Sequence, residues 1–600
     1  MPTDEVAPKE QVPGVEIHAP ATPELRNSPS LAILDWAWVL PALAILALIV
    51  RYGVAVPFWD HFTIAQTIIV WHDRGYPLWS ELIGQWNDSR MFFPKLLYWL
   101  NARFVGWDQR LELLTGWLFV LGTVVLLRAT GKRDMPGGFG VAFGFYASAL
   151  SFAIAQYANF LFGVSWCVFV PMWGLMLGIW AAGRAWGAVW KLGVAATGAV
   201  VASYSFANGL AVWGLMFPVL AAAVAGSRRE RAVLLAGWAA LMAVGVGYYF
   251  HGYQFAGQTR AGGIDDPWKV AGDAAIFIGN GPRVFADLRG SLGATRAVGI
   301  AGIAAVVALG IVIVAGGVVR RTPDVLLRAV PWMMLPAYSL MSALAVAVGR
   351  AREDSYLAVS ERYPTHGLPL FISLFPLAYL AVASWRGSRE WSNRVVTVVA
   401  AVVLSLLGLA TVVNLPMAVL QWGEGRRQSR AVAMLIVVAP NPILVKYALL
   451  ERIETPARLL PMLAERGLLR FPLVKDPFLP AQTAKPDGRL GAVDQIWRDG
   501  VRINVLGWAV APGRPGRHAD IVAVAALEPD GRYRLLSSSH DTFRPRPDVP
   551  KLLSRSYTSA SGFHLPFETP QVPPGTPLTF WTFDSDTQQF TLFAGPVPAP

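Results

Sequence analysis

The residues best suited to chemistry lie between the apolar segments of this chain rather than inside them. Asp60 and His61 stand in the stretch PFWDHF, and Asp88 and Arg90 follow in QWNDSR. A carboxylate placed at a membrane surface can act as a general base that takes a proton from a hydroxyl group. The first long gap between apolar segments therefore holds two candidate carboxylates in a chain that is poor in charge.

A second polar group lies much later, in VGRAREDSYLAVSERYPTHG (348–367), which places Arg350, Arg362 and Tyr363 between two apolar segments. Arginines on the side of a membrane that disfavours positive charge need an anionic partner, such as phosphate, a lipid headgroup or a carboxylate. Guanidinium groups can also stabilise a departing phosphate. The alternative is simple pairing with neighbouring carboxylates, which are Glu353, Asp354 and Glu361.

Structural roles compete with chemistry at Asp60 and at the histidines. Asp60 precedes HFTIAQTIIVW, whose apolar residues recur at helical spacing, so Asp60 is also a candidate N-cap of a short helix lying along the membrane interface. His61 and His72 are eleven residues apart, which is not the spacing of two metal ligands on one helix face. We expect them to be interfacial polar residues, and the sequence defines no metal site.

Composition sets the environment in which these residues act. Of the 600 residues, 54% are hydrophobic and only 15% are charged, well below the roughly 25% charged residues of soluble domains. The net charge of +12 comes mainly from arginines in short loops between apolar runs, a pattern of membrane topology rather than of nucleic-acid binding. The single cysteine, Cys167, excludes an intrachain disulfide and a cysteine-based zinc site.

Apolar runs long enough to cross a bilayer recur through the first two thirds of the chain. We expect about eleven spanning helices within residues 31–415. The candidate spans are 31–50, 111–128, 139–156, 160–182, 187–203, 208–225, 232–250, 297–319, 328–348, 367–385 and 395–415.

Basic short loops set the expected orientation. With eleven spans, five basic stretches fall on one side, which the positive-inside rule makes cytoplasmic. The N-terminus is then inside and the C-terminus outside, so the outer loops are 51–110, 251–296 and 349–366. The five basic stretches are RATGKRD (128–134), GRAW with Lys191, GSRRERA (226–232), RRTPDVLLR (320–328) and RGSREWSNR (386–394).

The two ends of the chain differ from its apolar middle. Residues 1–30 are rich in proline and glutamate and are expected to form a disordered cytoplasmic tail. Residues 416–490 are expected to be a helical linker of two or three short surface helices. In 491–600, alternating runs separated by PGRPG, PDG and PPG predict an antiparallel β-sandwich on the outer side. Its core aromatics are expected to be Trp508, Phe563, Phe567 and Trp581.

Several of these stretches resemble the GT-C superfamily of polytopic membrane glycosyltransferases, and most closely a set of uncharacterised bacterial members. The resemblance covers roughly residues 30–415. It is carried by PFWDHF, by QWNDSRMFFPKLL, which is similar to a QHNEHR-IFFPRLL motif, and by YANFLFGVSW, YSFANGL and GRAREDSYLAVSERYPT. The sandwich, with GWAV, RPDV and SGFHLPF, also looks like accessory modules attached to bacterial glycosyltransferases.

The resemblance implies roles for individual residues. The acidic residue of the first outer loop, Asp60, would be the catalytic or acceptor-binding carboxylate, with His61 beside it at the substrate. Asp88 and Arg90 would correspond to the second acidic motif. Arg350 and Arg362, with Tyr363, would contact phosphate. The relatives carry two histidines and a glutamate where this chain has Trp86, Asp88 and Ser89.

The expected function is transfer of a sugar from a polyprenyl-phosphate donor to an envelope glycan or lipid, on the outer face of a bacterial inner membrane. Expected partners are the lipid-linked sugar, the acceptor and membrane lipid, without nucleic acid. Some superfamily members use a divalent metal, but the sequence defines no ligand set. The alternatives are a transporter of lipid-linked saccharide and a non-catalytic envelope scaffold, the latter consistent with the altered histidine motif.

Overall fold

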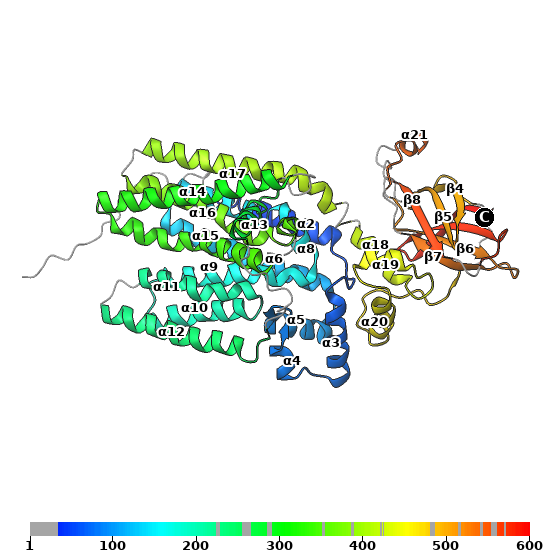
Figure 1. Ribbon diagram of the computed structural model, residues 1–600, viewed down its shortest axis with the longest axis horizontal. Coiled ribbons are helices and arrows are strands. Elements are labelled where there is room, and N and C mark those ends of the chain that lie inside the picture. Colours follow the sequence, from blue (N-terminus) through cyan, green and yellow to red (C-terminus); the bar gives the residue numbers. More distant parts are fainter. Residues whose placement is uncertain are drawn as a thin grey trace, which may run out of the picture.

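The computed structural model places a helical bundle and a β-rich region on either side of three short helices (Figure 1). The predicted tail, residues 1–30, lies outside the described residues. The structure describes residues 34–223, 228–254, 266–284, 291–350, 354–385, 389–419, 423, 425–479, 486–513, 518–539, 544–553, 561–568 and 572–600.

Apolar helices dominate the bundle. Within the described residues, eight segments are long and apolar enough to cross a membrane, judged by length and composition. Three shorter apolar helices accompany them, and each predicted span overlaps one of these segments, which confirms a mainly helical protein with several membrane-spanning helices. The shorter ones are α2 (Val39–Tyr52), α10 (Ala188–Ser203) and η3 with α11 (Ala207–Ala223). The eight are α6 (Gln109–Asp134), α7 to α8 (Gly138–Leu161), η2 with α9 (Gly163–Ala182), α12 (Arg228–Phe250), α14 (Leu292–Val319), α15 (Pro323–Gly349), α16 (Pro364–Ser384) and Arg394–Pro416 of α17 (Arg389–Met417).

Regular helix is interrupted between two of these segments, where the chain passes from the one that starts with α7 to the one that ends with α9. After α7 (Gly138–Ser151) the chain forms η1 (Ile154–Gln156), α8 (Tyr157–Leu161) and η2 (Gly163–Phe169) before α9 (Val170–Ala182). Irregular backbone at membrane depth is tolerated where protein surrounds it, and every residue of this interruption is buried.

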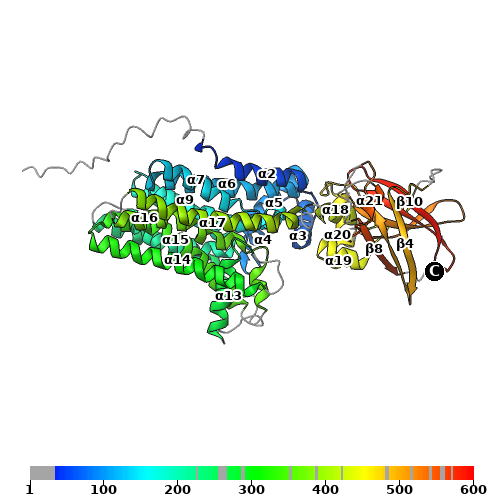
Figure 2. The ribbon, with the colours of Figure 1, turned by 90° about the horizontal axis from the view of Figure 1, so that it is seen from above.

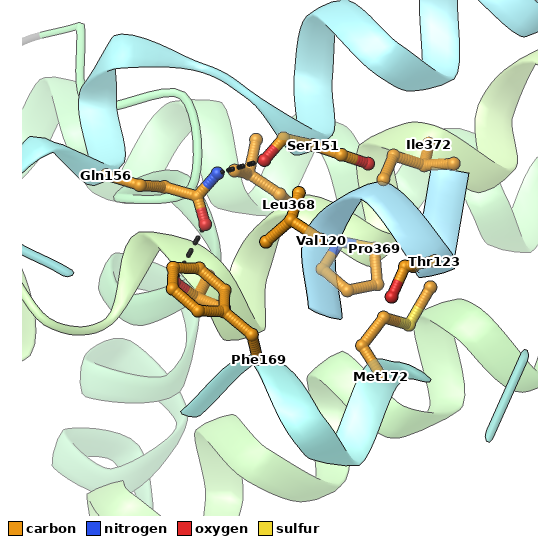
Figure 3. Close-up of a pocket in the computed structure, with 10 residues that line it drawn as sticks. Val120, Thr123, Ser151, Gln156, Phe169, Met172, Leu368, Pro369 and Ile372 are labelled. Atoms are coloured by element: carbon orange, nitrogen blue, oxygen red, sulfur yellow. Dashed lines mark hydrogen bonds between the residues drawn. The ribbon is translucent and has the colours of Figure 1, made fainter. Parts of the chain in front are cut away.

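Polar side chains tie this interruption to the start of α16. Gln156 donates to the Ser151 carbonyl at 2.8 Å and accepts from the Thr365 hydroxyl at 2.7 Å. Asn159 donates to the Thr365 hydroxyl oxygen and to the Arg362 carbonyl, at 2.8 and 2.9 Å. Beside Gln156 and Thr365 lies a cavity of about 30 Å³, large enough for roughly one water molecule (Figure 3). The network fixes the backbone of Arg362 at the end of the bundle.

Two of the predicted basic loops meet at one end of the bundle, where α6 finishes. The Asp134 carboxylate accepts from Trp332 at 2.9 Å, and its carbonyl accepts from Arg328. Asp35, an ionisable residue inside a predicted span, pairs with Arg128 and Lys132 at 2.5 and 2.6 Å. Loops 128–134 and 320–328 therefore share a face, as their charge pattern predicts.

The first long gap folds at the other end, where α6 begins. Figure 1 shows its helices next to the three linking helices. Helix α3 confirms the predicted amphipathic helix, with Ile64, Ile68 and Trp71 buried, and α5 corresponds to the second amphipathic segment. The elements are α3 (His61–Arg74), α4 (Trp79–Ile83), the hairpin of β1 (Gln85–Trp86) and β2 (Ser89–Arg90), and α5 (Phe92–Val105).

Two elements in the other predicted loops pack against the bundle. Helix α13 (Pro267–Gly279), in a segment with no predicted helix, packs beside α14 and α15 (Figure 2). Asp266 caps it by accepting from the backbone N–H groups of Trp268 and Lys269. The 3₁₀ helix η4 (Ser355–Val359) leads from α15 toward α16.

Three helices follow the bundle: α18 (Gly425–Met434), α19 (Pro442–Leu449) and α20 (Glu454–Glu465). They are not merely surface helices, because α18 is almost entirely buried. One hydrophobic core runs from α2 and α3 through α18 and α20 to the five-stranded sheet of the C-terminal region. The linking segment thus packs against both the bundle and the sheet.

The C-terminal region consists of two antiparallel sheets that share a core of residues from both. The sheet orders are β10-β9-β6-β7-β3 and β4-β5-β8. The four predicted core aromatics are buried, and Phe563 and Phe567 lie in this core. Trp581 packs toward the linking helices, and Trp508 packs against residues of α21. The strands are β3 (Phe478–Leu479), β4 (Gly491–Asp499), β5 (Arg502–Ala509), β6 (Ile521–Leu527), β7 (Tyr533–Ser539), β8 (Gly562–Glu568), β9 (Pro577–Asp584) and β10 (Gln589–Pro598), with α21 (Val549–Leu553) between β7 and β8.

Candidate functional site

The loop before α3 brings Asp60 next to Arg362. The Arg362 guanidinium lies 3.7 Å from the centroid of the Trp59 ring, a cation–π contact, and its charge acts on the Asp60 carboxylate. Neither group makes an ion pair or a side-chain hydrogen bond within the part of the chain that the structure describes. The meeting of these two residues, about 300 positions apart in the sequence, shows that the loops 51–110 and 349–366 share one face.

Asp60 occupies the N-cap position of α3, but its side chain makes no capping hydrogen bond. The predicted cap is therefore wrong, because the backbone at Asp60 already has helical dihedral angles rather than the extended ones of a capping residue. A half-buried carboxylate without a hydrogen-bond donor remains available to another molecule.

Burial raises the pKa of Asp60, and this effect exceeds that of the nearby positive charge of Arg362, which lowers the pKa. Glu451, from the loop between α19 and α20, contributes a second negative charge that raises the pKa further. The segments that carry Asp60 and Glu451 are joined by a backbone hydrogen bond, in which the Trp59 N–H donates to the Leu449 carbonyl at 2.9 Å. A carboxylate with a raised pKa is a stronger base than a solvated aspartate.

His61 lies behind Asp60 and is completely buried. Its Nε2 lies 2.9 Å from Oε2 of Glu112, in the first turn of α6, and Glu112 also accepts from Trp107 Nε1 at 3.2 Å. The other ring nitrogen, Nδ1, faces the backbone of Phe58, at 3.1 Å from its carbonyl oxygen. The phosphate contact predicted for His61 stays a prediction, and the observed contacts make the ring a positioning residue for the 58–61 turn.

Four aromatic rings pack together around this turn. Phe162, which lies between α8 and η2, contacts Phe58 edge-on at 5.6 Å, stacks with Trp59 at 5.9 Å and meets His61 edge-on at 5.4 Å, measured between ring centroids. The next residue, Gly163, has no room for a side chain, because a Cβ there would lie 2.5 Å from Oε2 of Glu112. The interruption in the bundle therefore positions the turn that carries Asp60.

Arg350 and Tyr363 lie at the edge of the same site. Arg350 is 6.0 Å from the Tyr363 ring centroid, and its charge acts on Arg362. The expected alternative is that Arg362 pairs with nearby carboxylates. Glu361 does not form this pair, because its Oε1 atom lies 3.6 Å from Nη2 of Arg283. Arg352 and Glu353 lie outside the described residues.

Asp88 and Arg90 are held in the β1–β2 hairpin against the end of α12. Arg90 is buried and donates to three backbone carbonyls, those of Ile83, Tyr249 and His251. The Asp88 carbonyl accepts from the Tyr253 hydroxyl at 3.1 Å, while its carboxylate is exposed. Arg90 is therefore engaged by the protein itself, and the substrate roles predicted for both residues stay predictions.

A metal has no evident place in this arrangement. Among the residues that the structure describes, no three His, Cys, Asp or Glu side chains converge in the way that would hold a metal ion. The donors nearest Asp60 are also committed, because His61 and Glu112 bind each other. These residues do not fit a divalent metal centre, and we derive no step through one.

Two carboxylates at the site, Glu112 and Glu451, are not among the residues predicted from the sequence. Glu112 could have been found from the sequence, because an ionisable residue at the end of an apolar span is costly to bury and needs a partner. Glu451 had no such signal, since it lies in a segment interpreted as a linker.

Three comparisons, with protein-family models, with curated proteins and with solved structures, found no match for this chain.

Proposed function

We propose that this chain is a membrane glycosyltransferase resembling the GT-C superfamily, which transfers a sugar from a polyprenyl-phosphate donor to an envelope glycan or lipid acceptor. One observation carries the proposal: the charge of Arg362 acts on a half-buried carboxylate with a raised pKa, Asp60, and neither group makes an ion pair or a side-chain hydrogen bond within the described residues. A base and a phosphate-binding group at one end of an apolar bundle are the two parts that such a transfer requires.

In the proposed reaction, Asp60 takes the proton of an acceptor hydroxyl as its oxygen attacks the anomeric carbon of the donor. The bond between that carbon and the phosphate oxygen breaks, and the phosphate leaves with the electron pair. Arg362, with Arg350 beside it, stabilises the negative charge on the leaving phosphate. Tyr363 contributes its ring next to Arg350, and the exposed Asp88 carboxylate is assigned to the acceptor.

The proposed topology has eleven spans, with the N-terminus inside and the C-terminal β-sandwich in the periplasm or outside the cell. It is supported by the contacts between basic loops at the end of the bundle away from Asp60. A reporter fused after Leu415 is expected to be active only on the outer side of a bacterial inner membrane. Cytoplasmic reporter activity would contradict the whole outer-face assignment.

The alternative class is a transporter of lipid-linked saccharide, for which the supporting observation is the group of buried polar side chains between α7 and α16, Gln156, Asn159 and Thr365. Two assays separate these functions. The purified protein is incubated with labelled polyprenyl-phosphate sugars and envelope acceptors, and proteoliposomes are tested for movement of the same lipid between leaflets. Label in the acceptor supports transfer, whereas movement of the lipid without transfer supports the transporter. The absence of both activities supports a scaffold.

The pH dependence of transfer is expected to report the charges around Asp60. The base works only when ionised, so the rate should fall as the pH drops through the raised pKa of Asp60. Arg362→Ala removes a charge that lowers this pKa and should move the acidic limb to higher pH. Glu451→Gln removes a charge that raises it and should move the limb to lower pH. Shifts of the same sign in both variants, measured from kcat/KM against pH, would contradict this assignment.

A further inference from the structure

Trp59, the residue directly before Asp60, has a left-handed backbone. Its φ angle is 50°, in a region that only glycine visits routinely. For a side chain as bulky as that of tryptophan this conformation is strained, and it persists only where the surrounding structure holds it. The contacts of Trp59 must therefore account for its backbone.

Hydrogen bonds to two helices hold the backbone of Trp59. Its N–H donates to the carbonyl of Leu449, the last residue of α19, at 2.9 Å. Its carbonyl accepts from the N–H of Phe62, in the first turn of α3, also at 2.9 Å. The left-handed residue is thus held from two sides, by segments that are almost 400 positions apart in the sequence.

The ring of Trp59 contacts both Phe162 and Arg362. The Phe162 ring stacks with it at 5.9 Å between centroids, with an angle of 15° between the two planes. The guanidinium carbon of Arg362 lies over the Trp59 ring, 3.7 Å from its centroid. Tryptophan is the ring that attracts cations most strongly, and the attraction grows where water is excluded. Burial lowers the pKa of Arg362, which places its guanidinium in such a poorly hydrated environment.

This ring contact is what holds the Arg362 side chain in place. Within the described residues the guanidinium makes no ion pair and no hydrogen bond. The Arg362 carbonyl accepts from Asn159 at 2.9 Å, which fixes the main chain but not the side chain, and the charge of Arg350 repels the guanidinium. A contact with a ring face uses none of the N–H donors of a guanidinium, so they stay available for the oxygen atoms of a ligand.

We propose that Trp59 is a positioning residue, which holds the Arg362 guanidinium by its ring face so that the N–H donors of Arg362 can bind the phosphate of the sugar donor. The inference rests on the proposed function for the identity of this phosphate. One left-handed residue then positions both parts of the reaction, because Asp60 follows Trp59 in the chain and Arg362 lies over its ring.

A double-mutant cycle on the binding of farnesyl phosphate to the full-length protein in detergent micelles tests this inference. Trp59→Leu is expected to weaken binding about five- to thirty-fold, as for the loss of a cation–π contact shielded from water. Arg362→Ala should weaken binding at least as much. In the Arg362→Ala background, Trp59→Leu should add less than about two-fold, because the ring acts through the guanidinium. Additive losses in the double variant, wild-type affinity in Trp59→Leu, or no binding by the wild type would overturn the inference.

Two control variants separate the attraction of the ring for a cation from its bulk. Trp59→Phe keeps an aromatic face and should bind farnesyl phosphate within about three-fold of wild type. Trp99→Leu removes another partly exposed tryptophan, from α5, and should bind like wild type. Equal losses in Trp59→Phe and Trp59→Leu, or a comparable loss in Trp99→Leu, would mean that packing alone matters and would overturn the inference.

The left-handed backbone has a test that does not depend on any ligand. At a φ of 50° glycine is favoured over alanine, so Trp59→Gly should unfold at a higher temperature than Trp59→Ala, although both variants lose the ring. The reverse order of the two thermal midpoints would contradict a left-handed residue at this position and overturn the role given to the backbone of Trp59.

The two proposals fail separately. If wild type transfers sugar but the losses of binding add in the double variant, the function stands and the role of Trp59 falls. If wild type binds farnesyl phosphate with the expected coupling between Trp59 and Arg362 but transfers no sugar to any acceptor, the role of Trp59 stands and the proposed transferase activity falls.

Discussion

Replacing Asp60 with asparagine is expected to lower the rate of sugar transfer by about 10²- to 10⁴-fold, the usual contribution of a general base. Asparagine matches the shape of aspartate but cannot accept the proton of the acceptor hydroxyl. The measurement is the initial rate with a labelled polyprenyl-phosphate sugar and saturating acceptor. Transfer at the wild-type rate would remove Asp60 from the mechanism.

Asp73→Asn is the matched control for this change. Asp73 lies on the same helix, and its exposed carboxylate pairs with Arg466 at 2.8 Å, so its loss should change the rate less than about two-fold. A fall in both variants would indicate damage to α3 rather than loss of a base.

The effect of Asp60→Asn on stability should have the opposite sign to its effect on rate. Because burial raises the pKa of Asp60, the folded protein prefers the neutral carboxyl group, and ionisation destabilises it at pH values above the folded pKa. At neutral pH the thermal midpoint of Asp60→Asn should therefore equal or exceed that of wild type. The two midpoints should converge as the pH falls below the pKa of an unfolded aspartate.

The membrane architecture was predictable because it depends on local composition. Each span is a run of apolar residues with a fixed minimum length, and the basic loops mark one end of the bundle. The same alternation placed Asp60 and Arg362 on one face, although nothing in the sequence indicates that the charge of Arg362 acts on Asp60. The break between the predicted spans 139–156 and 160–182 was also found, but the contact of Gln156 with Thr365 was not predicted, since the two residues are 209 positions apart.

The rest of the candidate site was unpredictable because it depends on packing between distant segments. Glu451 lies in a segment whose short amphipathic helices predict a surface linker, and only the shared core places it at the Asp60 turn. Arg90 shows the converse. Its position in a family-like motif suggests a ligand contact, whereas its guanidinium donates to one carbonyl at the end of α4 and two at the end of α12.

Replacing Glu112 with alanine is expected to destabilise the protein by about 3–5 kcal/mol, the usual cost of removing one partner of a buried charged pair. Glu112 is fully buried and accepts from both His61 and Trp107, so the variant leaves two donors without acceptors. Transfer should fall as well, because His61 holds the turn that presents Asp60. The measurements are the free energy of unfolding in mixed micelles and the transfer rate of the folded fraction.

Glu568→Ala is the control for this effect, since Glu568 forms an exposed pair with Arg502 at 3.1 Å and should cost at most about 1 kcal/mol. Glu112→Gln keeps the volume and one acceptor atom, so its loss of stability should lie between those of the two alanine variants. Equal stability of Glu112→Ala and Glu568→Ala would show that the buried pair does not hold the Asp60 turn. In that case a transfer rate that still falls in Glu112→Ala would place the Glu112 carboxylate in the reaction itself.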